Sequence, residues 1–251
     1  MSFAVIDPAA TTVKLQTAVL LYGTNGGMST AKYATVHPVT CTEGGQPVIR
    51  EGQPADRKAL LAFAQSLMDS CAIPSGVLSP NIMSVGPDHV VWYAPPSRET
   101  YFFNTRPVAE GAVSVGTRAG EAFSPGMIFA VRDKTMWVFA VKGKTRPDED
   151  TPLYHCPLMN VYIDGKVCTG SMPLPKSTMV ASIKEWQMSF WSSAFSHPNM
   201  MKAVNYKGGL HAFSVDLLDG KFKKFPERYL RRIPNLTLGT FVSRIESRKE
   251  C

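Results

Sequence analysis

Apolar residues follow strand-like patterns near the start of the chain and again in its middle. Residues 13–22 alternate partly and then run continuously apolar, and in residues 32–39 Ala34 and Val36 alternate with more polar neighbours. Both segments are expected to be strands. The same signals predict strands in the middle of the chain at residues 89–93, 101–104, 127–132 and 135–141.

Asp133-Lys134 separates the last two of these segments and predicts the clearest β-hairpin of the chain. Such short connections favour an antiparallel meander, because parallel neighbours need a crossover of a dozen or more residues. The charged, proline-containing segment 142–150 that follows is expected to be an exposed loop.

Two segments show helical spacing of their apolar residues. The first is 56–69, and the second begins after Ser177, which can cap it, and stops at Pro198. The main apolar positions are Leu60, Phe63, Ala64, Leu67 and Met68 in the first, and Met179, Ile183, Trp186, Phe190 and Phe195 in the second. The order of strands and helices predicts an α+β fold.

A cysteine lies between the meander and the second helix, just after a turn. Residues 160–163 are expected to form a short apolar strand, and Asp164-Gly165 a turn, because glycine accepts a positive φ. Cys168 follows this turn closely and is therefore expected to lie at the surface. Only an accessible thiolate can act as a nucleophile, so this position suits a reactive thiol.

The cysteines indicate a reduced, cytoplasmic chain. Cys41, Cys71, Cys156, Cys168 and Cys251 are odd in number, widely spaced and without a CxxC pair. The first ten residues lack the basic cluster of a secretion signal. No apolar run reaches the roughly 20 residues of a spanning helix, and no membrane partner is expected.

The net charge of +7 is concentrated near the C-terminus. Residues 201–251 hold eleven Lys and Arg against five Asp and Glu, which gives +6. A basic segment can bind nucleic acid or an acidic protein. A solvated basic face explains the same charge, and no recognised DNA-reading motif accompanies it.

The strip around the cysteine resembles the active site of ubiquitin-conjugating enzymes, where a His-Pro-Asn tripeptide leads through a turn and a glycine to the thioester cysteine. Asn160 stands eight residues before Cys168 and Gly165 three before it, which is the family's spacing. A meander before the strip and a helix after it match the family's order. Leu158-Met159 replaces the His-Pro of the tripeptide.

The chain resembles more specifically the protein B family of the bacterial ParB-related, ThiF-related (PRTRC) cassette, a prokaryotic branch with the ubiquitin-conjugating (UBC) fold. The resemblance rests on residues 154–157, 164–168 and 190–199. It implies a strand-strand-helix extension over 1–75, a UBC-like core over 76–200 with its active-site strip at 153–171, and a basic C-terminal extension over 201–251.

The resemblance also implies a function. Cys168 would carry the acyl group of a ubiquitin-like protein as a thioester, receive it from a ThiF-like activating enzyme and pass it to an amine. A JAB-type peptidase belongs to the same cassette, which is typically encoded on plasmids or mobile elements. No cofactor and no metal are expected.

Three other residues are candidates for the same site. Asn160 could donate to the oxyanion of the attack, or it could hold its own turn. His155 and His197 could each be the base for the incoming amine, or they could be structural histidines. Lys166 could lower the pKa of the thiol, whereas Cys156 is expected to be a packed thiol.

Three alternatives remain from the sequence. A cysteine hydrolase with Cys168 and His197 would use the same residues, without a known protease signature around the cysteine. A metal site built from His155, Cys156, Cys168 and His197 would lack the paired ligand spacing of known metal sites. A non-catalytic scaffold module could serve plasmid maintenance through its basic C-terminal part, with nucleic acid bound by Lys221, Lys223, Lys224, Arg231 and Arg232.

Overall fold

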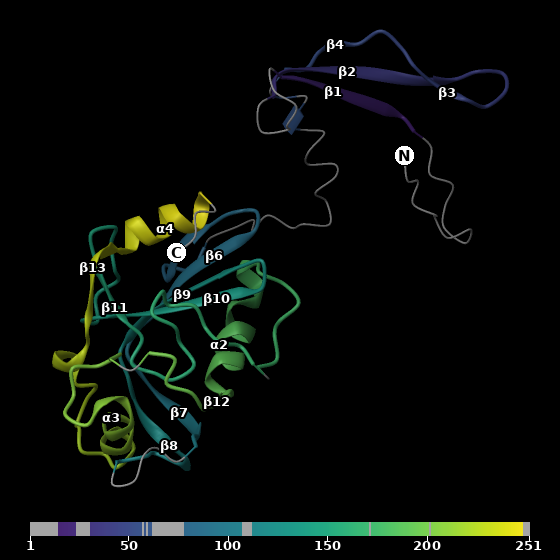
Figure 1. The fold of residues 1–251 in the computed structure, drawn as a ribbon. Coiled ribbons are helices and arrows are strands. Elements are labelled where there is room, and N and C mark those ends of the chain that lie inside the picture. The colour runs from purple at the N-terminus through teal and green to yellow at the C-terminus, as the bar shows by residue number, and fades with distance from the viewer. Residues whose placement is uncertain are drawn as a thin grey trace. The chain divides into compact units, whose positions relative to one another are not determined.

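The computed structural model divides the chain into two compact units, Met1–Ala72 and Ile73–Cys251 (Figure 1). The residues that the structure describes are 15–23, 31–56, 58, 60–61, 78–106, 112–170, 172–200 and 202–247. The second unit contains the cysteine strip and also the basic C-terminal segment.

The first unit is a small antiparallel sheet built around one long strand. β2 pairs with β1 along one edge, and with β3 and β4 as well. The bounds are β1 Thr17–Gly23, β2 Ala31–Cys41, β3 Pro47–Ile49 and β4 Gln53–Pro54. The two predicted strands are therefore confirmed where residues are described. The predicted helix at 56–69 lies outside the described residues, apart from residues 56, 58, 60 and 61.

A six-stranded sheet is the centre of the second unit, and every neighbouring pair in it is antiparallel. Its order is β13-β11-β10-β9-β6-β5. The bounds are β5 Ile82–Val85, β6 His89–Ala94, β9 Gly126–Arg132, β10 Thr135–Val141, β11 Pro152–His155 and β13 Arg232–Thr237. The predicted hairpin at Asp133-Lys134 is confirmed, and both turn residues have positive φ (47° and 64°). The predicted loop 142–150 is exposed apart from Pro147.

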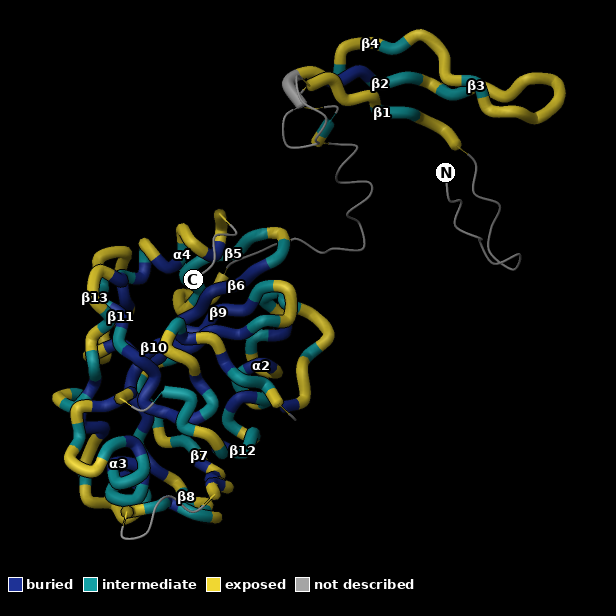
Figure 2. Tube along the Cα trace, in the orientation of Figure 1, coloured by how far each residue is buried: buried dark blue, intermediate teal, exposed yellow. Residues whose placement is uncertain are grey.

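Both faces of this sheet are buried, each under its own helix. One core, the α2 face, joins alternate residues of β6, β9 and β10 to α2 (Ile183–Trp191). The other, the α4 face, joins the intervening residues to α4 (Leu238–Glu246). Figure 2 shows β9 and β10 buried along nearly their whole length. Burial on both faces explains why these strands are continuous apolar runs in the sequence.

A second sheet lies against the α2 face. Its order is β12-β7-β8, with bounds β7 Ser97–Asn104, β8 Thr117–Ser124 and β12 Ala194–Phe195. β8 is too polar to stand out in the sequence, yet it pairs with β7 over all eight residues. Gly120 in β8 leaves room for α3 (Gly209–Leu218), because a Cβ there would lie 3.3 Å from Leu218.

The second predicted helix is wrong at both ends. A short 3₁₀ turn, Val180–Ser182, precedes α2, and the hydroxyl of Ser177 accepts from the backbone N–H of Met179 instead of capping the helix. The helix ends at Trp191, and Phe195 belongs to β12, which pairs in parallel with β7. Phe195 is nevertheless fully buried beside Phe190. Its apolar side chain therefore reflects burial in the core and not membership of the helix.

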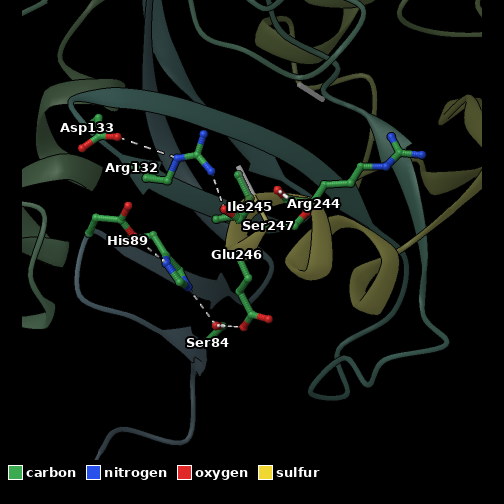
Figure 3. A network of polar contacts seen from close by, with 9 residues as sticks. Ser84, His89, Arg132, Asp133, Arg244, Ile245, Glu246 and Ser247 are labelled. Carbon is green, nitrogen blue, oxygen red and sulfur yellow. Dashed lines mark hydrogen bonds and ion pairs between the residues drawn. The ribbon is translucent and has the colours of Figure 1, made fainter. Parts of the chain in front are cut away.

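Hydrogen bonds hold the last turn of helix α4 to residues of β5 and β9 (Figure 3). The guanidinium of Arg132 donates to the carbonyl of Ile245 in the last turn of the helix. The Ser84 hydroxyl donates to Glu246 (3.0 Å) and also contacts Nε2 of His89 (3.2 Å). A reciprocal capping box between Thr237 and Thr240 begins the helix. The first turn of α4 is thus capped, and its last turn is bonded to the sheet.

Replacing Phe241 by alanine tests whether α4 covers a real core. The ring is 1% exposed and packs edge-on against Phe139 at 4.8 Å between centroids. We expect the free energy of unfolding of the full chain to fall by about 3–5 kcal/mol in urea denaturation. Ser243→Ala, on the exposed side of the same helix, should change it by less than about 0.5 kcal/mol. Equal effects of the two variants would contradict this packing.

Candidate active site

Residues 160–168 form a tight hairpin that presents the cysteine. Val161 and Val167 face each other in an isolated antiparallel bridge, and Gly165, with φ of 82°, makes the turn. The backbone N–H of Tyr162 donates to the carbonyl of Lys166 (2.9 Å). The predicted turn at Asp164-Gly165 is confirmed. The predicted strand 160–163 is wrong, because Asn160 has a φ of 63° and only Val161 pairs as a strand residue.

The central sheet holds this hairpin in place. Lys166 pairs with Trp137 of β10, and the N–H of Val138 donates to the carbonyl of Gly165 (2.8 Å). A Cβ on Gly165 would lie 2.2 Å from the ring of Phe139. Only glycine therefore fits, both for its φ and for its closeness to the core.

The pairing decides which side chains are exposed. Val161 and Val167 are buried in the core of the α2 face, at 3% and 5% exposure. Tyr162, Lys166 and Cys168 alternate with them and point to the opposite side. Because directly opposed strand residues share a face, Lys166 lies on the α4 side with Trp137. The buried valines anchor the hairpin, and Cys168 stays partly exposed on its outer side.

Tyr162 is the site residue that the sequence did not single out. The neighbouring Cys168 side chain raises the pKa of Tyr162 above its usual value, and the charge of the thiolate raises it further. The phenol therefore stays protonated and remains a donor. Tyr162 and Cys168 are diagonal neighbours across the hairpin, a relation that depends on the register of the Val161–Val167 bridge.

Asn160 joins the cysteine to the segment after α2. Its carbonyl accepts from the N–H of Cys168 (2.7 Å), and its own N–H donates to the carbonyl of His197 (2.7 Å). Its side-chain nitrogen donates to the carbonyl of Ala194 (2.7 Å). Its side-chain oxygen accepts from the N–H groups of Ser196 (3.0 Å) and His197 (2.9 Å). The amide thus holds another segment, not the backbone of its own turn.

His197 is brought near the cysteine by these bonds, and His155 is not. His197 is exposed, and its Nδ1 contacts the Ser196 hydroxyl at 2.8 Å. His155 lies opposite Phe139 on β10, whereas Lys166 lies opposite Trp137. Cys168 is two residues further along, so His155 is about 13 Å away along the strand. Its catalytic role stays a prediction.

The environment of His155 is that of a buried strand residue. It is 7% exposed, and its N–H donates to the carbonyl of Arg231 (3.0 Å). Burial lowers its pKa below the usual value, and the charge of Arg231 lowers it further. The ring is therefore neutral near pH 7.

The described cysteines differ sharply in environment. Cys156 is 3% exposed in the core, and burial raises the pKa of its thiol well above the usual range. Cys41 is exposed on β2 of the first unit. Cys168 alone among these three lies on the outer side of a hairpin in the second unit. Within the described ranges, no three His, Cys, Asp or Glu side chains gather where they could hold a metal ion.

A family model described as Prokaryotic E2 family D matches residues 59–233. The chain belongs to prokaryotic E2 family D. The match includes the whole 160–168 hairpin, and membership gives the chain a ubiquitin-conjugating-like role. The α+β fold agrees with this family.

Neither the comparison with curated proteins nor the comparison with solved structures gave a match to this E2-family chain. Among its described residues there is no helix long and apolar enough to cross a membrane.

Asn160→Asp tests whether the amide organises the site. The substitution keeps the size of the side chain but turns its donor toward Ala194 into an oxygen, which would face the Ala194 carbonyl. We expect the free energy of unfolding to fall by about 1–3 kcal/mol at neutral pH. Asn104→Asp is the matched control, because Asn104 only accepts a bond, from Thr117, on the surface. A loss no larger than that of the control would contradict the organising role.

His155→Gln tests the burial of this histidine through pH. Because the pKa of His155 is lowered in the folded chain, the unfolded chain binds more protons below about pH 6.5. The wild-type chain should therefore lose stability as the pH falls from about 7.5 to about 5.5. The variant should lose less over the same window in urea denaturation. Adding His211→Gln should reduce the loss further, since burial lowers that pKa too. An unchanged pH dependence would contradict the assignment.

Proposed function

We propose that this E2-family chain carries the acyl group of a ubiquitin-like protein as a thioester on Cys168. The observation that supports this most is the hairpin that holds the partly exposed Cys168 thiol on its outer side, with Tyr162 as its diagonal neighbour. The hairpin lies within the matched family range. Cys156, the other described cysteine of this range, is enclosed in the core.

The proposed reaction has two steps, a thioester exchange and an attack by an amine. The Cys168 thiolate attacks the thioester carbonyl on a ThiF-like activating enzyme, a new C–S bond forms, and the enzyme's thiolate leaves. An amine then attacks the Cys168 thioester, loses a proton to a base, and releases the Cys168 thiolate as the amide forms. Neither step needs an oxidant, a cofactor or a metal.

The geometry suggests a role for each neighbour. Tyr162, whose phenol stays protonated because its pKa is raised, is the hydroxyl that we propose to donate to the sulfur during the transfer. The Asn160 amide nitrogen carries two hydrogens and uses one on Ala194, so the second could bind the oxyanion of the attack. His197, held beside Asn160 and exposed, is the base that we propose for the incoming amine.

The partners follow from the more specific resemblance. Residues 154–157, 164–168 and 190–199 support membership of the PRTRC protein B branch. In such a cassette the chain would work with a ThiF-like activating enzyme and a ubiquitin-like protein, and a JAB-type peptidase would accompany them. This assignment predicts a bacterial chain that acts in the cytoplasm.

Adduct formation tests the proposal directly. The full chain, the activating enzyme, ATP and the ubiquitin-like protein of one gene neighbourhood should give an adduct that a thiol reductant removes. Cys168→Ser should give none, or a reductant-resistant ester, whereas Cys41→Ser should behave like the wild type because Cys41 lies on the first unit. No adduct from the wild-type chain, with an activating enzyme that forms its own thioester, would favour the non-catalytic scaffold module instead.

Tyr162→Phe extends this test to the hydroxyl. The ring stays and only the donor is lost, so adduct formation should slow by about tenfold or more at neutral pH. An unchanged rate of adduct formation would contradict a role of the Tyr162 hydroxyl in the transfer.

A further inference from the structure

A concave site is formed by residues outside the hairpin. A cavity of about 690 Å³ opens between the start of β7, the end of β8, the loop at 143–144 and the segment 224–228. None of its lining residues belongs to the 160–168 hairpin. Its size falls in the range of ligand-binding clefts. We call it the basic groove.

Four cations from three parts of the chain line the basic groove, against one carboxylate. They are Arg98, Lys144, Lys224 and Arg228, and the carboxylate is Glu227. One oxygen of Glu227 already accepts from the N–H of Gly143 (2.9 Å), which ties two walls of the groove together. Lys144 and Lys224 are exposed, and within the described residues neither forms an ion pair. The groove is therefore a site of unbalanced positive charge.

Both arginines are held in place by aromatic rings. The Arg98 guanidinium lies 5.2 Å from the centre of the Phe123 ring, and that of Arg228 lies 4.7 Å from the centre of the Tyr229 ring. Arg98 also approaches Glu121 at 3.8 Å, but both side chains are well exposed, so this pair is weak. A guanidinium group that contacts an aromatic ring has less freedom to move, and its planar donors suit carboxylate oxygens.

The rest of the lining is apolar. Phe225 and Pro226 are buried at the wall, and Pro96 and Phe123 are half-buried. A chain that alternates acidic and apolar residues would place carboxylates against the cations and apolar side chains against this surface. The remaining oxygen of Glu227 could accept a backbone N–H from such a chain.

We propose that the basic groove binds an extended acidic segment of a partner protein, at a site separate from the acyl-carrying cysteine. Nucleic acid fits less well for two reasons. Of the two aromatic residues that line the groove, Phe123 already has the Arg98 guanidinium over its ring and Phe225 is buried, so they offer little surface for stacking bases. Glu227 interrupts the row of cations and would repel a continuous phosphate backbone.

Fluorescence anisotropy with the full chain tests this proposal. The probe is a labelled octapeptide of alternating Glu and Leu, and the reference probe replaces each Glu by Gln. The acidic peptide should bind at least about tenfold more tightly, with an affinity that falls as salt rises. Arg98→Gln with Arg228→Gln should weaken the binding of the acidic peptide about tenfold, because both guanidinium groups, which can each bind a carboxylate through two N–H groups, are lost.

Lysine variants provide the matched comparison. Lys144→Gln with Lys224→Gln should weaken binding about fivefold without disturbing a packed ring, since both side chains are exposed. Lys176→Gln with Lys184→Gln removes the same charge outside the groove and should change little. Cys168→Ser should bind like the wild type, which separates this site from the thioester chemistry.

Three outcomes would overturn the proposal. The first is equal binding of the acidic and the Gln peptides. The second is an equal loss in the two lysine pairs, which would mean a general charge effect. The third is tighter binding of an eight-nucleotide oligo-dT than of the acidic peptide, with the same dependence on Lys144 and Lys224, which would assign the groove to nucleic acid.

Discussion

One edge of β10 supports the whole candidate site. β11 pairs there only with Phe139 and Ala140, and the same edge then accepts Lys166 at Trp137. Two segments of different origin thus share one strand, and the 160–168 hairpin continues the sheet where β11 ends. Because β10 is buried on both faces, it can move very little. The rigidity of the cysteine hairpin derives from this strand.

The asparagine adds a second attachment on the other side of the hairpin. Backbone bonds run from Cys168 to Asn160 and from Asn160 to His197, so the segment after α2 closes against the strip. Leu158 and Met159, which stand where ubiquitin-conjugating enzymes have His-Pro, are 4% and 0% exposed in the core. The chain thus anchors its strip with apolar packing before the asparagine and with an amide network at it. Functionally, this leaves the outer side of the hairpin free for Tyr162 and the thiol.

The structure separates the basic residues of the C-terminal segment into two groups with different environments. Lys221 bonds to Asp216 (2.7 Å), and Arg231 donates to the carbonyl of Lys202 (3.0 Å), so both serve the fold. Lys224 and Arg228 instead meet Arg98 and Lys144 around the basic groove. A count of charges along the sequence cannot distinguish these uses, because the distinction depends on which partners lie nearby. The two proposed sites are thus built from different parts of the second unit.

The sequence by itself determined the strands at β6, β9 and β10, the Asp133-Lys134 hairpin, the turn at Gly165 and the position of Cys168 just after that turn, because these follow from local hydrophobic runs and turn residues. It did not determine β8, which pairs with β7. It also did not determine the place of Phe195, because the spacing of this apolar residue fits a helix although the residue lies in β12. Tertiary structure alone decided that Tyr162 meets Cys168, that Asn160 holds the segment 194–197, and that His155 lies away from the thiol. These relations depend on register and on contacts between distant segments, which no local pattern encodes.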